Sequence, residues 1–228
     1  MDIFAYLEEK YDLLINYIDL PGRRFKILSV SDIEILLDRV EDEDQLPFWA
    51  QLWPSAQGLA RYLWGLQSIK GIKALELGAG TGLCGIAAAV RGARVVQTDY
   101  IPDALQFCRA NAALNEVEGI AFEIADWRNF QLPGTFPLIF ASDILYEPTL
   151  HQYLVDVMVQ KLAPGGTVVI ADPGRRTVMG FLDLAEQAGF IWQVENIAIS
   201  QNDTGGVIQT IPATSSIDII KLFLSDPN

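Results

Sequence analysis

The pattern of apolar and polar positions becomes regular at about residue 54. From there, short apolar runs alternate with segments whose apolar residues recur every three or four positions, as in buried strands separated by amphipathic helices. Pro54 suits the first turn of a helix, and one apolar stripe follows it at Ala56, Leu59, Ala60 and Leu63. Further along, the pattern predicts strands at 72–77, 94–98, 119–124, 137–142 and 166–171, and helices at 82–91, 102–115, 149–162 and 176–188.

The C-terminal part breaks this rhythm. Segments near 190–199, 206–211 and 216–224 are β-like with no helix between them, so we predict a terminal antiparallel hairpin. The preceding strands alternate with helices, an order that builds a parallel sheet with helices on both faces. The fold class predicted for the domain at residues 54–228 is therefore α/β, with a mostly parallel sheet and an antiparallel C-terminal hairpin.

The N-terminal extension, residues 1–53, has a different pattern. Apolar residues at helical spacing predict a helix near 2–18, and a short strand follows at 25–30. Residues 31–34 have the pattern of a capping box that opens a second helix. Glu41–Asp44 is an acidic run, either a solvated loop or a clamp for a basic partner. We therefore expect an α-rich extension that ends in an acidic loop.

Composition narrows the classes of function. The chain has 228 residues, half of them apolar and a fifth charged, and a formal net charge of −13. This is the balance of a globular domain, and the negative charge would repel a phosphate backbone, so we predict no nucleic-acid partner. The start of the sequence lacks a signal-peptide pattern, and no apolar run is long enough to span a bilayer. We expect a cytoplasmic location and no membrane partner.

Residues that often carry metal or nucleophilic chemistry are scarce. Cys84 and Cys108 are the two cysteines of the sequence, lie on apolar faces of predicted helices, and match no zinc-ligand spacing. His151 is the single histidine, and we expect a surface or satisfied residue rather than a catalytic base. No metal site is predicted.

The strongest local signal is a glycine-rich turn. Gly78-x-Gly80-x-Gly82 follows a buried strand and comes directly before a helix, where backbone can approach a ligand and the helix offers free N–H groups. The dinucleotide fingerprint requires a third glycine at the position of Leu83, so that fingerprint is absent. Glu76, two residues before the first glycine, suits a positively charged ligand without phosphate.

Acidic residues follow the next two strands as well. Asp99 ends the strand at 94–98, where it can accept hydrogen bonds from ribose hydroxyls, and Asp126-Trp127 follows the strand at 119–124, where a carboxylate and an indole suit an adenine ring. Each acid alone could cap a helix or lie in a solvated loop. Together they stand at consecutive strand ends, where such sheets bind their ligands, so we predict one site.

These motifs resemble those of class I S-adenosylmethionine-dependent methyltransferases, over roughly residues 54–224. The resemblance rests on Glu76-x-Gly-x-Gly-x-Gly82, Asp99 and Asp126. It implies a Rossmann-like fold with a seven-stranded sheet, S-adenosylmethionine as the methyl donor and S-adenosylhomocysteine as the product.

A narrower resemblance comes from three other segments. Pro47-Phe-Trp-Ala-Gln-Leu-Trp-Pro54, Asp143-Ile-Leu-Tyr146 and Asp172-Pro-Gly-Arg175 are similar to the protein-lysine methyltransferase branch called methyltransferase family 16. Within that branch, the segment that ends in Trp53-Pro54 and the segment Asp172–Arg175 are most similar to the lysine methyltransferases of the electron-transfer-flavoprotein β-subunit. The resemblance implies that Asp143 and Tyr146 are catalytic and that the substrate is a protein with an accessible lysine.

The residue types suit this chemistry. Transfer of a methyl group to an amine needs a neutral nucleophile placed in line with the methyl group, which is largely a problem of positioning. Asp143 can accept a hydrogen bond from the incoming amine, and Tyr146 can supply a hydroxyl and an aromatic wall. A desolvated amine beside a sulfonium loses its proton more readily, so no strong base is required.

Several further residues are candidates for the same site. The aromatic residues Trp49, Trp53 and Tyr100 either face cationic groups of the donor or the substrate, or are packed core. Arg175, together with Asp172, either binds a carboxylate of the substrate protein or caps the loop after the fifth strand of the sheet.

We therefore predict a lysine N-methyltransferase that acts on a protein, with a basic substrate surface favoured by the acidic extension, and we expect a monomer. An N-methyltransferase for small amines is the first alternative, because an Asp/Tyr pair suits it equally. A non-catalytic module that binds S-adenosylmethionine or a partner is the second. A nicotinamide-dependent oxidoreductase is disfavoured by the glycine spacing.

Overall fold

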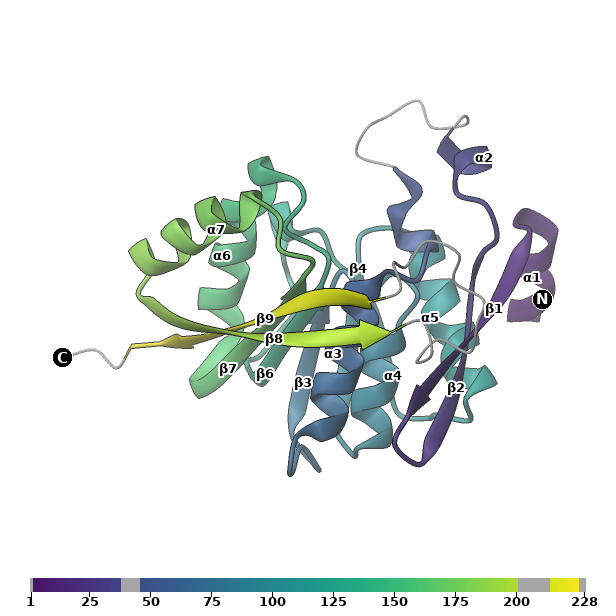
Figure 1. Ribbon diagram of the computed structural model, residues 1–228, viewed down its shortest axis with the longest axis horizontal. Helices are drawn as coiled ribbons and strands as arrows, with labels where there is room; N and C mark the ends of the chain where they lie inside the picture. The colour runs from purple at the N-terminus through teal and green to yellow at the C-terminus, as the bar shows by residue number, and fades with distance from the viewer. Residues whose placement is uncertain (1, 38–45, 201–213, 226–228) are drawn as a thin grey trace.

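The computed structural model describes residues 2–37, 46–200 and 214–225. Two predicted segments, the acidic loop Glu41–Asp44 and the strand near 206–211, lie outside these ranges. The main sheet has seven strands in the order β5-β4-β3-β6-β7-β9-β8, and Figure 1 shows β9 and β8 at the end of this sheet beyond β7. Its strands are β3 (Lys73–Leu77), β4 (Arg94–Asp99), β5 (Ala121–Ile124), β6 (Phe136–Ser142), β7 (Leu162–Asp172), β8 (Phe190–Ser200) and β9 (Thr214–Leu224).

Pairing within this sheet agrees with the predicted fold class. β3 pairs in parallel with β4 and β6, and the parallel pairing extends outward to β5 on one side and to β7 on the other. β9 lies antiparallel between β7 and β8. The predicted α/β fold, with its antiparallel C-terminal hairpin, is therefore confirmed.

Helices cover both faces of the sheet. They are α3 (Pro54–Gly65), α4 (Leu83–Val90), α5 (Pro102–Leu114), α6 (His151–Lys161) and α7 (Thr177–Gln187). Successive side chains of a strand point to opposite faces. Leu75 and Leu77 of β3 therefore pack with α6 and α7, whereas Ala74 packs with α3 and α4. In the part of the chain that the structure describes, no helix combines the length and the apolar character needed to cross a bilayer.

The N-terminal extension contains a β-hairpin, so the predicted helix at 2–18 is wrong beyond its first half. The elements here are α1 (Ile3–Lys10), β1 (Leu13–Leu20), β2 (Arg23–Val30) and α2 (Glu34–Leu37). Asn16, Ile18 and Leu20 are buried and alternate with more exposed residues, which is the period of a strand. Because Leu14 and Ile15 also fit a helical spacing, the apolar pattern alone could not separate the two structures.

The predicted capping box is replaced by a simpler cap. Asp32 accepts a hydrogen bond from the Glu34 N–H at 2.9 Å, so Asp32 rather than Ser31 caps α2. The Ser31 hydroxyl instead donates to Asp12 at 2.7 Å, next to the start of β1.

Two buried asparagines fasten the hairpin to α5. Asn111 Oδ1 accepts from the Leu28 N–H at 2.6 Å, and its Nδ2 donates to the carbonyls of Leu28 at 3.0 Å and Thr81 at 2.8 Å. Asn115, one turn later, makes the same pair of bonds with the N–H and carbonyl of Lys26. Figure 1 shows the hairpin beside α5, away from α6 and α7. Because Thr81 belongs to the turn after β3, Asn111 also links the hairpin to that turn.

One acidic side chain of α5 joins several polar groups of α1 and of the residue that follows it. Asp103, in the first turn of α5, accepts hydrogen bonds from the hydroxyls of Tyr6 at 2.7 Å and Tyr11 at 2.5 Å and from Lys10 Nζ at 3.0 Å. The extension is thus joined to α5 both at α1 and at β2.

We expect Asn111→Ala to lower the free energy of unfolding by about 2–4 kcal/mol, because it leaves a buried N–H and two buried carbonyls without their partner. Denaturant unfolding of both proteins measures this. Asn129→Ala is the matched control, since Asn129 is exposed, and it should change the free energy by no more than about 0.5 kcal/mol. Equal effects of the two substitutions would contradict a fastening role for Asn111.

Candidate active site

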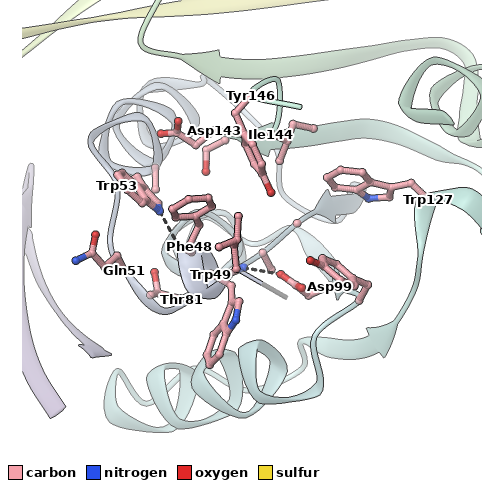
Figure 2. Close-up of a pocket in the computed structure, with 17 residues that line it drawn as sticks. Phe48, Trp49, Gln51, Trp53, Thr81, Asp99, Trp127, Asp143, Ile144 and Tyr146 are labelled. Atoms are coloured by element: carbon pink, nitrogen blue, oxygen red, sulfur yellow. Dashed lines mark hydrogen bonds between the residues drawn. The ribbon is translucent and has the colours of Figure 1, made fainter. Parts of the chain in front are cut away.

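A pocket lies at the carboxyl ends of β3, β4 and β6 (Figure 2). The direction in which successive strands are added reverses between β3 and β6, and such switch points open a crevice for ligands. Its lining comes from the segment before α3, the turn after β3 and the loops after β4, β5 and β6. The lining residues are Leu46, Phe48, Trp49, Gln51, Trp53, Ala56, Gly78, Ala79, Gly80, Thr81, Asp99, Tyr100, Trp127, Ser142, Asp143, Ile144 and Tyr146.

The turn after β3 needs its glycines for two different reasons. Gly78, Gly80 and Gly82 all have left-handed backbone, with φ of +64°, +52° and +83°. A Cβ on Gly80 would also lie 3.2 Å from the Trp49 carbonyl oxygen, so the segment before α3 rests directly on the turn. Gly78 and Gly80 line the pocket, as predicted. Gly82 faces the interior, where a Cβ would meet Cys108 Sγ at 3.0 Å.

Asp99 stands in the pocket at the end of β4, where the sequence predicted it. Its Oδ2 accepts from the Gly80 N–H and its Oδ1 from the Ile101 N–H, both at 3.0 Å. Burial raises the pKa of this carboxyl to about 6, against the lowering effect of the N–H groups. Tyr100, the next residue, also lines the pocket.

Glu76 lies beneath the glycine turn and does not line the pocket. Its Oε2 accepts from Gln97 Nε2 at 2.7 Å, and the same nitrogen donates to the Gly82 carbonyl at 3.0 Å. The side chain is buried, and burial raises its pKa to about 8 from an ordinary 4.5. The predicted contact with a positively charged ligand is therefore replaced by support of the turn from within. Gln97 lies opposite Glu76 on β4, a pairing that spacing along the chain does not reveal.

Three aromatic rings form one wall of the pocket. Phe48 packs edge-to-face with Trp53 at 6.1 Å and with Tyr146 at 5.8 Å between ring centroids. Trp53 Nε1 donates to the Phe48 carbonyl at 2.7 Å, and Figure 2 shows the three side chains close together. Trp53 was predicted for this site, and Phe48 was not.

Trp49 contributes its backbone to the pocket, and its indole points elsewhere. The ring packs with Tyr11 at 5.9 Å and with Phe107 at 5.7 Å between ring centroids, in a cluster that also contains Leu7 of α1. The ring thus packs against aromatic partners, one of them Tyr11 of the extension, that the sequence did not show, and its contact with a substrate stays a prediction.

Asp126 and Trp127 take different positions after β5. Trp127 lines the pocket, close enough to the turn that a Cβ on Gly78 would lie 3.2 Å from its ring. Asp126 instead forms an ion pair with Arg128 at 2.8 Å and is not among the lining residues. The hydrogen bonds from Arg128 lower the pKa of Asp126. Of the two residues predicted for the adenine site, Trp127 therefore lies in the pocket, and Asp126 lies outside it with a partly exposed side chain.

Asp143 and Tyr146, the two predicted catalytic residues, share the loop after β6 and both line the pocket. Asp143 has left-handed backbone, with φ of +60°, and its N–H donates to the Ala171 carbonyl of β7 at 2.9 Å. Tyr146 lies at the rim with 42% of its surface exposed. Partial burial, followed by the nearby Asp99 carboxylate, raises the pKa of Tyr146, so its hydroxyl stays protonated at neutral pH.

The loop between these two residues is anchored at its centre. The Leu145 carbonyl accepts from Thr177 Oγ1 at 2.6 Å and lies 3.2 Å from His151 Nε2. His151 is buried and packs edge-to-face on Phe181, so it is a satisfied residue, as expected. Residues of α6 and α7 therefore fix the loop that carries Asp143 and Tyr146.

Asp172 and Arg175 lie behind this loop and do not line the pocket. The Arg175 guanidinium forms ion pairs with Asp143 and, at 2.8 Å, with Asp172. Burial alone would lower the pKa of Arg175, but the two carboxylates raise it. Arg175 was predicted to bind a substrate carboxylate or to cap its own loop. The structure instead joins it to a predicted catalytic acid.

The charge of the pocket is one-sided. Among the described residues that line it there are two carboxylates and, besides Trp49, which contributes its backbone, five aromatic residues, but no lysine, arginine or histidine. Such a lining suits a cationic ligand and offers nothing to a phosphate.

Several lining residues escaped the sequence analysis. Phe48, Thr81, Ser142 and Ile144 all lie within or beside the predicted motifs, so a rule that included motif neighbours would have found them. Small and apolar side chains carry no chemical signature of their own.

The family model for lysine methyltransferases matches residues 34–187, well over half of the chain. The chain belongs to the lysine methyltransferase family. The matched stretch contains the glycine turn, Asp99, Asp143 and Tyr146, so the family assignment and the pocket coincide.

The curated relatives that this chain resembles carry the names of several different methyltransferases. The electron transfer flavoprotein beta subunit lysine methyltransferase of Xenopus laevis is 35% identical over 132 residues, 57% of this chain and 53% of the relative. Protein N-lysine methyltransferase METTL21A of Mus musculus is 38% identical over 114 residues, 46% and 52% of the two chains. Histone-arginine methyltransferase METTL23 of Homo sapiens is 38% identical over 105 residues, 42% and 55%. The chain spans about half the length of these relatives.

Solved structures support the fold. A precorrin-6y C5,15-methyltransferase from Geobacter metallireducens has a TM-score of 0.60 at 17% identity, covering 74% of this chain and 88% of that one. A putative RNA methyltransferase from Pyrococcus horikoshii has a TM-score of 0.59 at 16% identity, covering 83% and 95%. At these identities the likeness shows the class I methyltransferase fold alone.

In this member of the lysine methyltransferase family, we expect the stability of the fold to decrease as pH rises, because Glu76 is buried and holds its proton in the folded state. The unfolded chain loses the Glu76 proton near pH 4.5 and the folded chain near pH 8, so folding becomes less favourable as pH rises through this window. Glu76→Gln cannot ionise. Its free energy of unfolding, measured with urea from pH 5 to pH 9, should therefore rise relative to the wild type as pH increases.

Glu123→Gln is the matched control for this series, because Glu123 is exposed on β5. Its pH dependence should follow the wild type. Parallel curves for Glu76→Gln and the wild type would show that Glu76 does not hold its proton in the folded state.

Proposed function

We propose that this chain is an S-adenosylmethionine-dependent N-methyltransferase that methylates a lysine side chain of a protein. The observation that carries the proposal is the pocket lining, which places Asp99 and Asp143 among aromatic rings with no cationic residue in the described lining. The lysine methyltransferase family, to which the chain belongs, supports the same activity.

The pocket residues fit S-adenosylmethionine. Asp99 is held by two backbone N–H groups and keeps lone pairs for ribose hydroxyls. Gly78 and Gly80 let the backbone approach the donor, and the indole of Trp127 offers an apolar face for a base. When bound, S-adenosylmethionine supplies an electrophilic methyl group on a positively charged sulfur. Aromatic rings and carboxylates suit that charge.

Asp143 and Tyr146 would position the acceptor. The Asp143 carboxylate can accept a hydrogen bond from an incoming amine and so direct its lone pair into the pocket. The Tyr146 hydroxyl, which stays protonated, can accept a second hydrogen bond from the amine, and its ring forms a wall beside Phe48. These residues hold and orient an amine without serving as strong bases, and burial of the amine favours its neutral form.

Exposure of Tyr146 favours a macromolecular acceptor over a small amine. With 42% of its surface exposed, the residue stands at an open rim, where a side chain presented by another protein can enter. A metabolite enzyme would be expected to enclose this residue. The net charge of −13 favours a basic substrate surface. The expected cytoplasmic location, monomeric state and lack of nucleic-acid binding remain predictions.

The donor site is tested by isothermal titration calorimetry with S-adenosylhomocysteine and, separately, with NAD. We expect binding of the first and none of the second. Asp99→Asn, which loses one acceptor, should weaken the binding by about 1–3 kcal/mol, which is about 5-fold to 150-fold. Asp156→Asn, an exposed change on α6, should leave the affinity unchanged. Undiminished affinity in Asp99→Asn would remove Asp99 from the donor site.

The acceptor is tested by incubating the enzyme and radioactive S-adenosylmethionine with the basic-protein fraction of a cell lysate. Mass spectrometry of the labelled proteins then locates the methylated residue. Lysine is the expected site, and label on arginine or on small amines alone would overturn the proposal. Asp143→Asn should then keep the donor affinity within about twofold but slow turnover about 100-fold or more, because the amide lacks the charge that holds the amine in the transition state.

Asp183→Asn, an exposed substitution on α7, is the control for Asp143→Asn and should methylate at the wild-type rate. Near-wild-type turnover in Asp143→Asn would refute the role of Asp143. A large loss of donor affinity would instead assign Asp143 to the donor site.

A further inference from the structure

The acid that faces the acceptor is already paired with a cation from behind. Arg175 contacts the Asp143 carboxylate, and its other guanidinium nitrogen reaches Asp172 Oδ2 at 2.8 Å. The Asp143 and Asp172 side chains are only 8% and 0% exposed, so solvent screens this chain of charges weakly. An ion pair on a solvated surface would have little effect on a neighbouring group. This pair lies at the back of the pocket.

Arg175 has little freedom to leave this position. Asp172 Oδ1 accepts from the N–H groups of Gly174 at 2.9 Å and Arg175 at 2.7 Å, so the same acid fixes both the backbone and the side chain of Arg175. Asp143 is tied to the same strand, because its N–H donates to the carbonyl of Ala171. The two acids therefore stand at the ends of neighbouring strands with the guanidinium between them.

Several acidic residues of the described part of the chain lie around this pair. Besides Asp172, Glu147 follows Tyr146 on the same loop, and Asp99 acts on Tyr146 from β4. Asp218 of β9 lies opposite Asp172 and close to Gly174. Within the ranges that the structure describes, Arg175 is the cation paired with Asp143.

A carboxylate facing an entering lysine has two opposing effects. It orients the amine, but it also stabilises the ammonium form, which has no lone pair to attack a methyl group. A cation on the far side of the carboxylate cancels much of the second effect and leaves the hydrogen-bond acceptor in place.

We propose that Arg175 is a positioning residue that balances the charge of Asp143, so that the acceptor lysine is bound as a neutral amine. Asp172 holds Arg175 for this purpose. Among residues 2–37, 46–200 and 214–225, its ion pairs are with these two acids, so it would act on the acceptor through Asp143. The proposal rests on the proposed function, since it concerns the acceptor site of that reaction.

The test is the pH dependence of single-turnover methylation between pH 6 and pH 10, with saturating S-adenosylmethionine and saturating amounts of the lysine protein labelled in the lysate. Under these conditions the ascending limb reports the ionisation of the bound acceptor. In Arg175→Gln the unbalanced Asp143 should move this limb upward by about one pH unit or more. S-adenosylhomocysteine affinity, measured by calorimetry, should stay within about twofold.

Two further variants separate charge from structure. Arg175→Lys keeps the charge but loses the forked geometry, so it should keep the wild-type limb with a lower maximal rate. It also keeps the test open if Arg175→Gln fails to fold, in which case an upward shift in Arg175→Lys would overturn the proposal. Arg176→Gln removes the neighbouring exposed arginine and should change neither the limb nor the rate.

The remaining outcomes are distinguishable from failure of the proposed function. An unshifted limb in Arg175→Gln, with the wild type active on lysine, overturns this proposal alone. An unshifted limb with a lower acceptor KM would show that Arg175 competes with lysine for Asp143, and that also overturns it. Absence of lysine methylation by the wild type overturns the proposed function and this inference with it.

Discussion

The hydrogen bond from the Gly80 N–H to the Asp99 carboxylate joins the turn after β3 to the end of β4, and the floor of the pocket depends on it. The turn can make this bond only with left-handed backbone at its glycines. The Trp49 carbonyl packs directly against Gly80. On the buried side of the turn, Gln97 donates a hydrogen bond to Glu76. One short turn thus receives contacts from β4, from the segment before α3 and from its own strand.

The features that could be predicted from the sequence are those that show as a periodic apolar pattern or as a motif at the end of a strand. The parallel sheet, its terminal hairpin, the glycine turn and the placement of Asp99 in the pocket followed from local patterns, whereas Asp143 came from the resemblance to a known family. Prediction from the sequence failed where a partner distant in sequence decides the conformation. Glu76 turns inward because Gln97 lies opposite it, and the Trp49 ring turns away because Tyr11 and Phe107 receive it. No spacing rule includes such partners.

The loop after β6 illustrates how much of a site lies outside its lining. Asp143 and Tyr146 face the pocket, but the position of their loop is set by Thr177, His151 and Arg175, each of which acts from α6, α7 or the segment before α7. Rigid packing behind a loop is what allows its side chains to meet a reacting group in one geometry. The left-handed backbone of Asp143 is held by these contacts.

The two asparagines of α5 have one more consequence. A hairpin of two strands leaves a row of backbone N–H and carbonyl groups along each edge, and such a row is a template for pairing with another chain. Asn111 and Asn115 occupy the groups of Leu28 and Lys26 on one edge of β2 with side-chain amides. An amide has the same donor and acceptor as a peptide, so α5 substitutes for a third strand. This edge of the hairpin is thereby closed to intermolecular β-pairing and the aggregation that it would seed.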